Sequence, residues 1–213
     1  MSCPLVLPLP YLPAHAVFAP YASEPYALFL DSQQPGHPAS RFSFIAVRPV
    51  QVFEGPGATP LQKMAQRLCE IEKNFNLPPF QGGLAGYFPF EAGLAADLIP
   101  LPQAAGQPTF SIGLYSAVAA YDHWEQRAVL FCLAAFLKES PACWQARFQM
   151  AAPLPVFGHD VPLPPLHPPG RFLEQVKAAR RFIRAGDISQ VNVSQRFAAP
   201  FPGHASAFGL FLK

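Results

Sequence analysis

The residues from 187 to 197 carry polar side chains in a pattern that could form a binding site. Val191, Val193 and Phe197 fall on one side of an extended chain, and a period of two predicts a strand with one buried face. Such a strand is common where water covers one side of an antiparallel sheet. The pattern alone therefore leaves open whether the other face binds a ligand or water. That face would carry Gln190, Asn192, Ser194 and Arg196.

A helix is expected immediately before this segment, over residues 171–185. Its apolar residues Phe172, Val176 and Ile183 recur at the spacing of one helical face. Gly186 follows, and glycine tolerates the left-handed backbone that often ends a helix. We therefore expect a helix, a glycine turn and the polar strand in succession.

Residues 183–197 read Ile-Arg-Ala-Gly-Asp-Ile-Ser-Gln-Val-Asn-Val-Ser-Gln-Arg-Phe. This stretch resembles the signature of the chorismate-utilising enzymes, in particular component I of aminodeoxychorismate synthase and of anthranilate synthase. Two earlier stretches resemble motifs of that family in the same order, namely residues 30–32 with 40–42 and the glycine-rich residues 80–88. Three ordered motifs make the resemblance specific. They match the N-terminal half of the family's proteins.

The resemblance implies an α+β fold, with two antiparallel sheets packed across each other, helices outside them and an active site in the cleft between the sheets. The element order agrees, because strands and helices are mixed without a steady βαβ alternation. We expect an N-terminal component I-like region over residues 1–151 and a proline-rich connector over 152–170. The start of a chorismate-binding region, which is incomplete, would occupy 171–213.

Composition and turn signals predict further elements. Helices are expected after Thr59 and Ser140, each followed by proline at the first helical position. Strand glycines more often permit close packing than ligand contact, and we expect this of Gly82, Gly83 and Gly86. The helix side chains expected to pack inward are Leu61, Met64, Leu68 and Ile71 in the first helix and Trp144 and Phe148 in the second. Strands are expected over residues 16–18, 26–30, 81–90, 109–121 and 128–136, and a strand or a pair of strands over 41–53.

The resemblance places Gln190 at the chorismate site. Family members that add water to chorismate carry a lysine at this position, where it resembles a general base. A lysine with a lowered pKa can take a proton, whereas an amide cannot. Gln190 therefore favours amination by ammonia, and Asn192 resembles the aminodeoxychorismate branch more than the anthranilate branch.

Leu30, Ser32, Arg41 and Phe42 match the motif that in both branches helps to form a tryptophan pocket between the sheets. Asp31, beside Ser32, departs from the family pattern, and so does Ser189, at a position that is often aromatic in the family. Arg41 could instead be a structural ion-pair partner. Both interpretations of Arg41 stay open.

The resemblance implies the N-terminal part of the subunit that aminates chorismate to 4-amino-4-deoxychorismate for p-aminobenzoate and folate biosynthesis. A glutamine amidotransferase, component II, would supply the ammonia. Mg²⁺ is the implied cofactor, and its glutamate ligands would lie beyond Lys213, so we expect no metal site within this chain and no activity from the chain alone. Two alternatives stay open: component I of anthranilate synthase, in tryptophan biosynthesis, or a non-catalytic module that binds tryptophan or a partner.

Composition argues against several classes of protein. Charged residues make up 13% of the 213, and the net charge of +2 is too small to indicate nucleic acid or an anionic membrane as a partner. Prolines interrupt the charge-free residues 1–23, so this stretch cannot be a membrane helix, and it lacks the pattern of a signal peptide. The four cysteines show no paired metal-ligand spacing. We expect a cytoplasmic protein.

Overall fold

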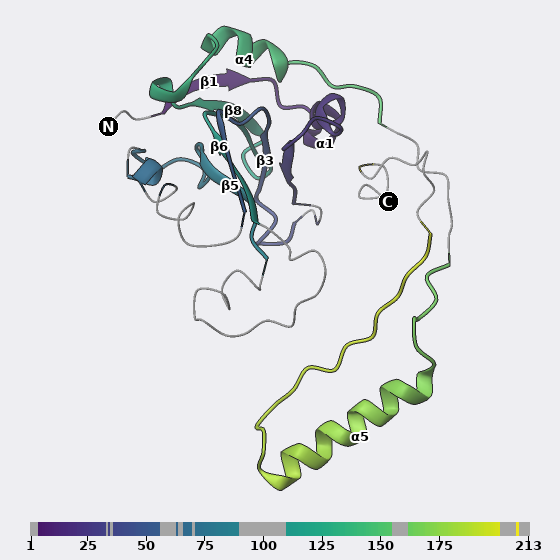
Figure 1. Cartoon of the computed structure of the whole chain (residues 1–213). Helices are drawn as coiled ribbons and strands as arrows, with labels where there is room; N and C mark the ends of the chain where they lie inside the picture. Colours follow the sequence, from purple (N-terminus) through teal and green to yellow (C-terminus); the bar gives the residue numbers. More distant parts are fainter. Residues whose placement is uncertain are drawn as a thin grey trace. The chain divides into compact units, whose positions relative to one another are not determined.

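The chain forms two compact units, Met1–Leu154 and Pro155–Lys213 (Figure 1). No helix among the described residues is long and apolar enough to cross a membrane. Of the helix predicted after Thr59, the structure does not describe Thr59, Leu61 and Met64. Leu68 of the same helix is described, and its side chain is half exposed. The computed structural model describes residues 4–32, 34, 36–55, 63, 66–69, 71–89, 110–154, 162–200 and 208.

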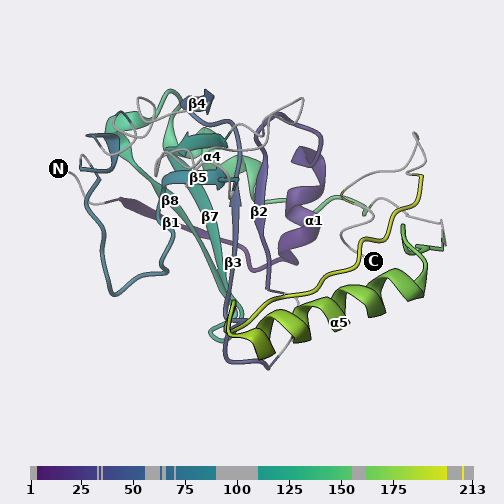
Figure 2. The ribbon, with the colours of Figure 1, turned by 60° about the horizontal axis from the view of Figure 1, so that its bottom comes forward.

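Two antiparallel sheets make up the first unit. The larger has the strand order β1-β8-β7-β3-β2, which Figure 2 shows side by side, and the smaller has the order β4-β6-β5. Together with the helices, these sheets confirm the expected α+β fold class. The strands are β1 (Leu5–Leu9), β2 (Leu28–Leu30), β3 (Phe42–Ala46), β4 (Gln51–Gly55), β5 (Gly83–Tyr87), β6 (Phe110–Tyr115), β7 (Ala117–Asp122) and β8 (Arg127–Cys132).

The chain passes from the smaller sheet to the larger one at Ser116. β6 ends at Tyr115 and pairs with β4 and β5, whereas β7 begins at Ala117 and pairs with β3 and β8. The single strand expected over residues 109–121 is therefore wrong, because the two halves of that stretch belong to different sheets. The expected pairing with residues 128–136 is confirmed for β7 and β8.

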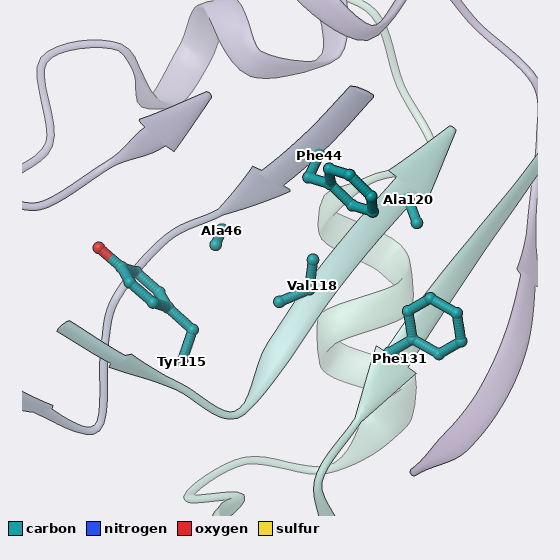
Figure 3. Packing of buried hydrophobic residues seen from close by; sticks show 6 residues of the cluster. All are labelled: Phe44, Ala46, Tyr115, Val118, Ala120 and Phe131. Carbon is teal, nitrogen blue, oxygen red and sulfur yellow. The ribbon is translucent and has the colours of Figure 1, made fainter. Parts of the chain in front are cut away.

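Side chains from both sheets form the core between them. All six residues of β7 are buried, so this central strand is covered on both faces. Phe80 and Ala85 are partly buried and pack against this core from the side of the smaller sheet. The sheets are therefore joined by apolar contact, the dominant stabilising term in folding. Figure 3 shows the buried members of the cluster, which are Phe44, Ala46, Tyr115, Val118, Ala120 and Phe131.

Close backbone approach in the smaller sheet requires glycine. A Cβ at Gly86 would overlap the backbone of Ser111 on the neighbouring strand β6. At Gly82 a Cβ would lie 2.7 Å from Cδ1 of Leu133. The expected packing role is confirmed at both positions, whereas at Gly83 the nearest atom lies at an ordinary contact distance of 3.4 Å.

Helix α1 (Ala14–Phe18) lies beside β3 and leads directly into the 3₁₀ helix η1 (Ala19–Tyr21). The strand expected over residues 16–18 is therefore wrong. The amides of Ala16 and Val17 both donate to the carbonyl of Pro13, at 2.9 and 3.1 Å, which is helical bonding. Pro13 is the N-cap residue, one position before the first helical position at which proline is favoured.

Helix α4 (Pro141–Arg147) follows a 3₁₀ helix, η2 (Ala134–Phe136). As expected, the Ser140 side chain caps it by accepting from the amide of Cys143, and Trp144 and Phe148 are buried. Nε2 of Gln145 donates to the carbonyl of Pro8 on the edge strand β1, at 2.7 Å. The helix is thus anchored both by its apolar side and by a polar contact to the sheet edge.

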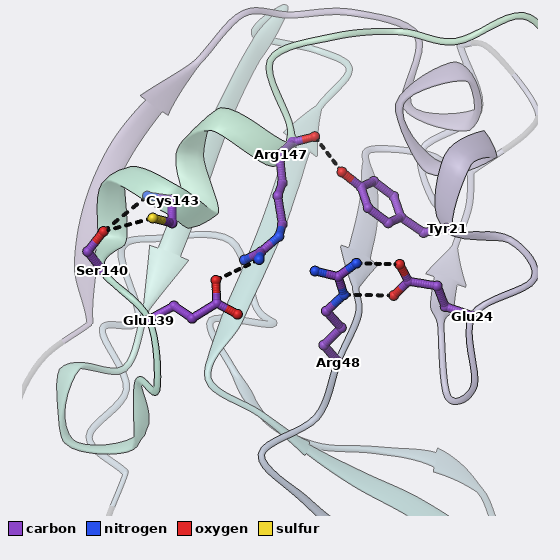
Figure 4. Close-up of polar contacts among 7 residues, drawn as sticks. All are labelled: Tyr21, Glu24, Arg48, Glu139, Ser140, Cys143 and Arg147. Carbon is purple, nitrogen blue, oxygen red and sulfur yellow. Dashed lines mark hydrogen bonds and ion pairs between the residues drawn. The ribbon is translucent and has the colours of Figure 1, made fainter.

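Polar contacts join α4 to the segment after α1 (Figure 4). The hydroxyl of Tyr21 donates to the carbonyl of Arg147 at 2.7 Å. Two ion pairs flank this bond, Arg147 with Glu139 and Arg48 with Glu24, each at 2.6 Å. The bond between Tyr21 and Arg147 connects residues 126 positions apart, whereas the two ion pairs join residues closer in the chain.

The second unit contains helix α5 (Pro169–Ala185) and an extended segment. Gly186 has φ 81°, and Asp187 donates its amide to the carbonyl of Phe182 at 3.0 Å, so the expected helix and glycine turn are confirmed. The strand expected after Gly186 is not formed. Within the described part of this unit only Phe197 has a bridge partner, Pro165, and a strand needs a continuous hydrogen-bonded neighbour.

Candidate functional site

The segment after Gly186 exposes its polar side chains. Leu166 donates its amide to the carbonyl of Arg196 at 2.8 Å, and Nε2 of Gln195 donates to the carbonyl of His167 at 3.3 Å, so the segment runs alongside the proline-rich residues. Val191 is 47% exposed, so the apolar face is also uncovered here. The role of Gln190 at a chorismate site stays a prediction. The exposed polar residues are Gln190, Asn192, Ser194 and Arg196.

The predicted pocket residues lie around the β2–β3 pair in the first unit. Oγ of Ser32 donates to the carbonyl of Phe42 at 2.6 Å, and Leu30 pairs with Phe44 across the strands. Arg41 directly precedes β3. The structure therefore brings Ser32, Arg41 and Phe42 together, while Leu30 is 44% exposed at the sheet edge. Whether they bind tryptophan stays a prediction.

Arg41 forms an ion pair with Asp122 at the end of β7. Its Nη2 lies 2.7 Å from Oδ2 of Asp122, and its Nε lies 3.0 Å from the same oxygen and 3.2 Å from Oδ1. The guanidinium carbon lies 4.8 Å from the ring centre of Phe42 and 5.1 Å from that of Trp124. Arg41 is thus oriented by charge and by two aromatic rings, as in the ion-pair interpretation.

Both carboxylate oxygens of Asp122 are saturated with hydrogen bonds. Oδ1 accepts from the amides of Trp124 and Glu125, at 3.0 and 3.2 Å, in addition to Arg41. Burial alone would raise the pKa of Asp122, but the bonds from Arg41, Glu125 and Trp124 outweigh burial and hold that pKa below its usual range. The carboxylate therefore stays ionised and fully engaged.

A second polar network lies on the opposite face of β3 from Phe42, because neighbouring strand residues point to opposite faces. It is centred on Ser43, which is fully buried. Oγ of Ser43 donates to Oδ1 of Asp31 at 2.8 Å and accepts from the amide of Ser32 at 3.1 Å. The same oxygen lies 2.7 Å from Nε2 of His123, whose Nδ1 lies 2.8 Å from the hydroxyl of Tyr11.

The proton positions in this network follow from the number of hydrogens. Ser43 has one hydroxyl hydrogen, which goes to Asp31. Nε2 of His123 therefore donates to Ser43, and in a neutral ring Nδ1 accepts from Tyr11. A serine, a histidine and an aspartate are thus in contact, but the acid touches the serine rather than the histidine and Ser43 is inaccessible. The arrangement is structural and cannot act as a nucleophile with its base.

Arg41 and Phe42 also line a groove of about 530 Å³ on the inner face of the larger sheet. Its other lining residues come from β1, β7, β8, the turn after β7 and the segment of residues 73–79. Leu30 and Ser32 are not among the described residues that line it. The groove and the predicted tryptophan pocket therefore share two residues but extend in different directions from β3.

Within the described part of the chain, no group of three or more His, Cys, Asp or Glu side chains could hold a metal ion. These residues do not fit the magnesium site that the family resemblance implies. The position of the magnesium ligands beyond Lys213 stays an expectation. The described site is thus one of hydrogen bonds and ion pairs.

Residues 25–213 match the family model described as chorismate binding enzyme. This chain belongs to the chorismate-binding enzyme family. Aminodeoxychorismate synthase component 1 of Klebsiella aerogenes is 25% identical to it over 95% of this chain and 49% of the relative. The protein of the same name from Escherichia coli is 27% identical over 89% and 46%.

The chain is also similar to a relative whose name refers to another reaction. Anthranilate synthase component 1 of Streptomyces coelicolor is 30% identical over 76% of the chain and 36% of the relative. The crystal structure of anthranilate synthase component I from Streptococcus pneumoniae has a TM-score of 0.52 at 19% identity, covering 83% of this chain and 44% of that one, which supports the same fold. The chain spans less than half the length of each of these relatives.

Proposed function

We propose that this chorismate-binding family member is the N-terminal part of the synthase subunit that aminates chorismate to 4-amino-4-deoxychorismate. Ammonia would come from a glutamine amidotransferase partner, in p-aminobenzoate and folate biosynthesis. Relatives named aminodeoxychorismate synthase component 1 support this proposal, because their similarity covers 89–95% of the chain.

The observation that carries the amination part of the proposal is Gln190. Gln190 lies in the exposed segment after α5. By resemblance, family members that add water to chorismate carry a lysine at this position of the signature. An amide has no basic nitrogen with which to remove a proton from water. Neutral ammonia is a stronger nucleophile than water and can add without first losing a proton to a base. Gln190 therefore supports amination rather than hydroxylation.

A second candidate reaction is the synthesis of anthranilate. The relative from Streptomyces coelicolor supports this alternative, since it carries that name at 30% identity. Asn192 supports the first reaction by its resemblance to the aminodeoxychorismate branch. Both reactions require ammonia, so Gln190 is compatible with either and the product decides between them.

We further propose that residues 1–213 alone do not turn over chorismate and that the protein is cytoplasmic. The relatives are more than twice as long as the part of them that this chain matches. By resemblance, the magnesium ligands belong to the part not matched, and so does a lysine that is catalytic in the aminodeoxychorismate branch. The third possibility, a module that binds tryptophan or a partner without chemistry, predicts that no extension of the chain is active.

The decisive experiment uses the complete product of the gene. It is incubated with chorismate, magnesium and ammonium salts, and the product is identified by mass and by retention against standards. Formation of 4-amino-4-deoxychorismate supports the proposal, and anthranilate would replace it with the second candidate. A hydroxylated product would overturn the argument from Gln190. Absence of any product, with folding verified by circular dichroism, would favour the module.

The variant Gln190→Lys tests the residue itself. If the amide excludes water, the lysine variant gains a hydroxylated product while the aminated product decreases. Ser189→Ala is a matched control in the same exposed segment and should leave the product ratio unchanged. Equal product ratios in wild type and Gln190→Lys would show that position 190 does not select the nucleophile.

A further inference from the structure

The second unit is the positively charged part of this chain. Pro155–Lys213 contains seven Lys and Arg residues against three Asp and Glu, whereas Met1–Leu154 contains eight against ten. Five of those seven cations lie on helix α5, whose only acidic residue is Glu174. Helix α5 therefore concentrates positive charge in a chain that is otherwise poor in charged residues.

Four of these cations form one stripe along α5, which we call the basic stripe. It consists of Lys177, Arg180, Arg181 and Arg184. Spacings of three, four and seven residues place these side chains within about 100° of the helix circumference and about 10 Å of its length. All four residues are exposed. The helix thus presents a compact row of positive charge.

The basic stripe lies on a different face of α5 from the apolar residues. Phe172, Val176 and Ile183 are centred about 110° away from it around the helix axis. Any part of a longer protein that packs on the apolar face therefore leaves the basic stripe accessible. The accessibility of the stripe does not depend on what covers the apolar residues.

The cations of the basic stripe repel one another. Lys177 and Arg181 stand four residues apart, as do Arg180 and Arg184, and like charges at this spacing destabilise a helix. None of the four forms an ion pair within the described part of the chain. The negative end of the helix dipole offsets part of the repulsion, because the stripe lies towards the C-terminus of α5. Carboxylates of a partner would offset the rest and stabilise the helix.

We propose that the basic stripe of α5 is a docking surface for an acidic protein face, carried by the glutamine amidotransferase subunit of the proposed reaction. Three of its four residues are arginine, whose planar guanidinium pairs with a carboxylate through two parallel hydrogen bonds. Arginine is also enriched at protein interfaces. The choice of partner rests on the proposed function, because that reaction requires a second protein.

The first test measures binding of the complete gene product to the amidotransferase subunit of the same organism, by titration calorimetry at low and high salt. Wild type should bind, and its affinity should fall as salt screens the charges. Lys177→Glu/Arg181→Glu should weaken binding by about tenfold or more. Arg171→Glu reverses a charge on the same helix outside the stripe and should bind as wild type does. Absence of binding by wild type, or equal affinities of all three proteins, would overturn the proposal.

The second test separates docking from the reaction. Product formation is measured with glutamine plus the amidotransferase subunit and, separately, with ammonium salts alone. Lys177→Glu/Arg181→Glu should lose most of the glutamine-dependent rate and keep the ammonia-dependent rate. Lys177→Arg/Arg181→Lys retains both charges and should keep both rates. A parallel loss of both rates in the charge-reversed variant would show that the substitutions act within the subunit itself, and the docking proposal would fail.

The two tests also distinguish failure of the docking surface from failure of the proposed function. If wild type forms no aminated product from ammonia, the proposed function is wrong, and calorimetry still decides whether the stripe binds the amidotransferase subunit. An anionic membrane is the competing partner and is tested by sedimentation with vesicles that contain phosphatidylserine. Vesicle binding that Lys177→Glu/Arg181→Glu loses, with amidotransferase binding unchanged, would assign the stripe to lipid and overturn the proposal.

Discussion

Arg41 and Asp122 face each other where β3 meets β7, with Nη2 of the arginine 2.7 Å from Oδ2 of the aspartate. The strand register creates this contact, because Phe42 pairs directly with Asp122 and Arg41 stands one residue before it. The two residues are 81 positions apart in the chain. This long-range contact restrains the end of the larger sheet. It also engages the guanidinium of Arg41, a residue of the motif that resembles the family's tryptophan pocket.

Replacing Asp122 by Asn should lower the free energy of unfolding by about 1 kcal/mol at neutral pH, which is below the usual range for a charged hydrogen bond because Arg41 is partly exposed. The pKa of Asp122 is lowered in the folded chain, so its contribution is present above the unfolded pKa and is lost as pH falls through the folded pKa. Urea unfolding in the acid range should therefore show a smaller pH slope in Asp122→Asn. Glu24→Gln, in a more exposed ion pair, should change stability much less, and an equal effect would contradict the assignment.

Ser43→Ala should destabilise the first unit by about 1–3 kcal/mol, because it leaves part-buried partners without a hydrogen bond. The affected groups are the carboxylate of Asp31 and Nε2 of His123. Chemical denaturation monitored by circular dichroism measures the change. Ser32→Ala removes a single, part-buried bond and should cost less. The network assignment fails if the two variants are equally stable.

Gly86→Ala should destabilise the chain more than Gly55→Ala. Both glycines have positive φ, but a Cβ at Gly55 meets open space, whereas one at Gly86 overlaps the backbone of Ser111. Overpacking against an immobile backbone costs about 1–3 kcal/mol beyond the conformational strain that both variants share. Thermal unfolding of the pair measures the difference directly. Equal melting temperatures would show that β5 and β6 are not so closely packed.

Stability should decrease at alkaline pH through Tyr115. Burial raises the pKa of Tyr115 to about 12, and its hydroxyl donates to the carbonyl of Tyr26 at 2.7 Å. A folded pKa above the unfolded value of about 10 means that the stabilisation is complete below pH 10 and is lost as pH rises towards 12. Tyr115→Phe should reduce this alkaline slope in urea unfolding. Burial also raises the pKa of Tyr121, so part of the slope should persist.

Local signals predicted several elements correctly because short-range chemistry determines them. The cap formed by Ser140 and the left-handed Gly186 each depend on residues within one helical turn. The β7–β8 pair was likewise predictable from its polar turn. The motif around Ser32 and Arg41 was also found, although the sequence alone could not choose between a ligand and an ion pair for Arg41.

Long-range contacts were not predictable from the pattern of residues. Asp122, His123 and Tyr11 were not among the predicted site residues, because their partners lie 80 or more positions away. The change of sheet at Ser116 has no local marker, since both flanking strands are apolar. The strand expected after Gly186 had the right alternation, but alternation describes only which faces a strand would present. Pairing also requires a neighbour.

The contact between Gln145 and Pro8 has a consequence for self-association. β1 is an edge strand of the larger sheet, and a free edge invites another chain to add a strand. Pro8 lacks the amide hydrogen such an addition requires, and its carbonyl is already bonded to Gln145. A foreign strand added at this edge would thus lack the hydrogen bonds at Pro8. The sequence of β1, LVLPL, is apolar, and Pro8 with its bond to Gln145 makes this edge a poor template for a foreign strand.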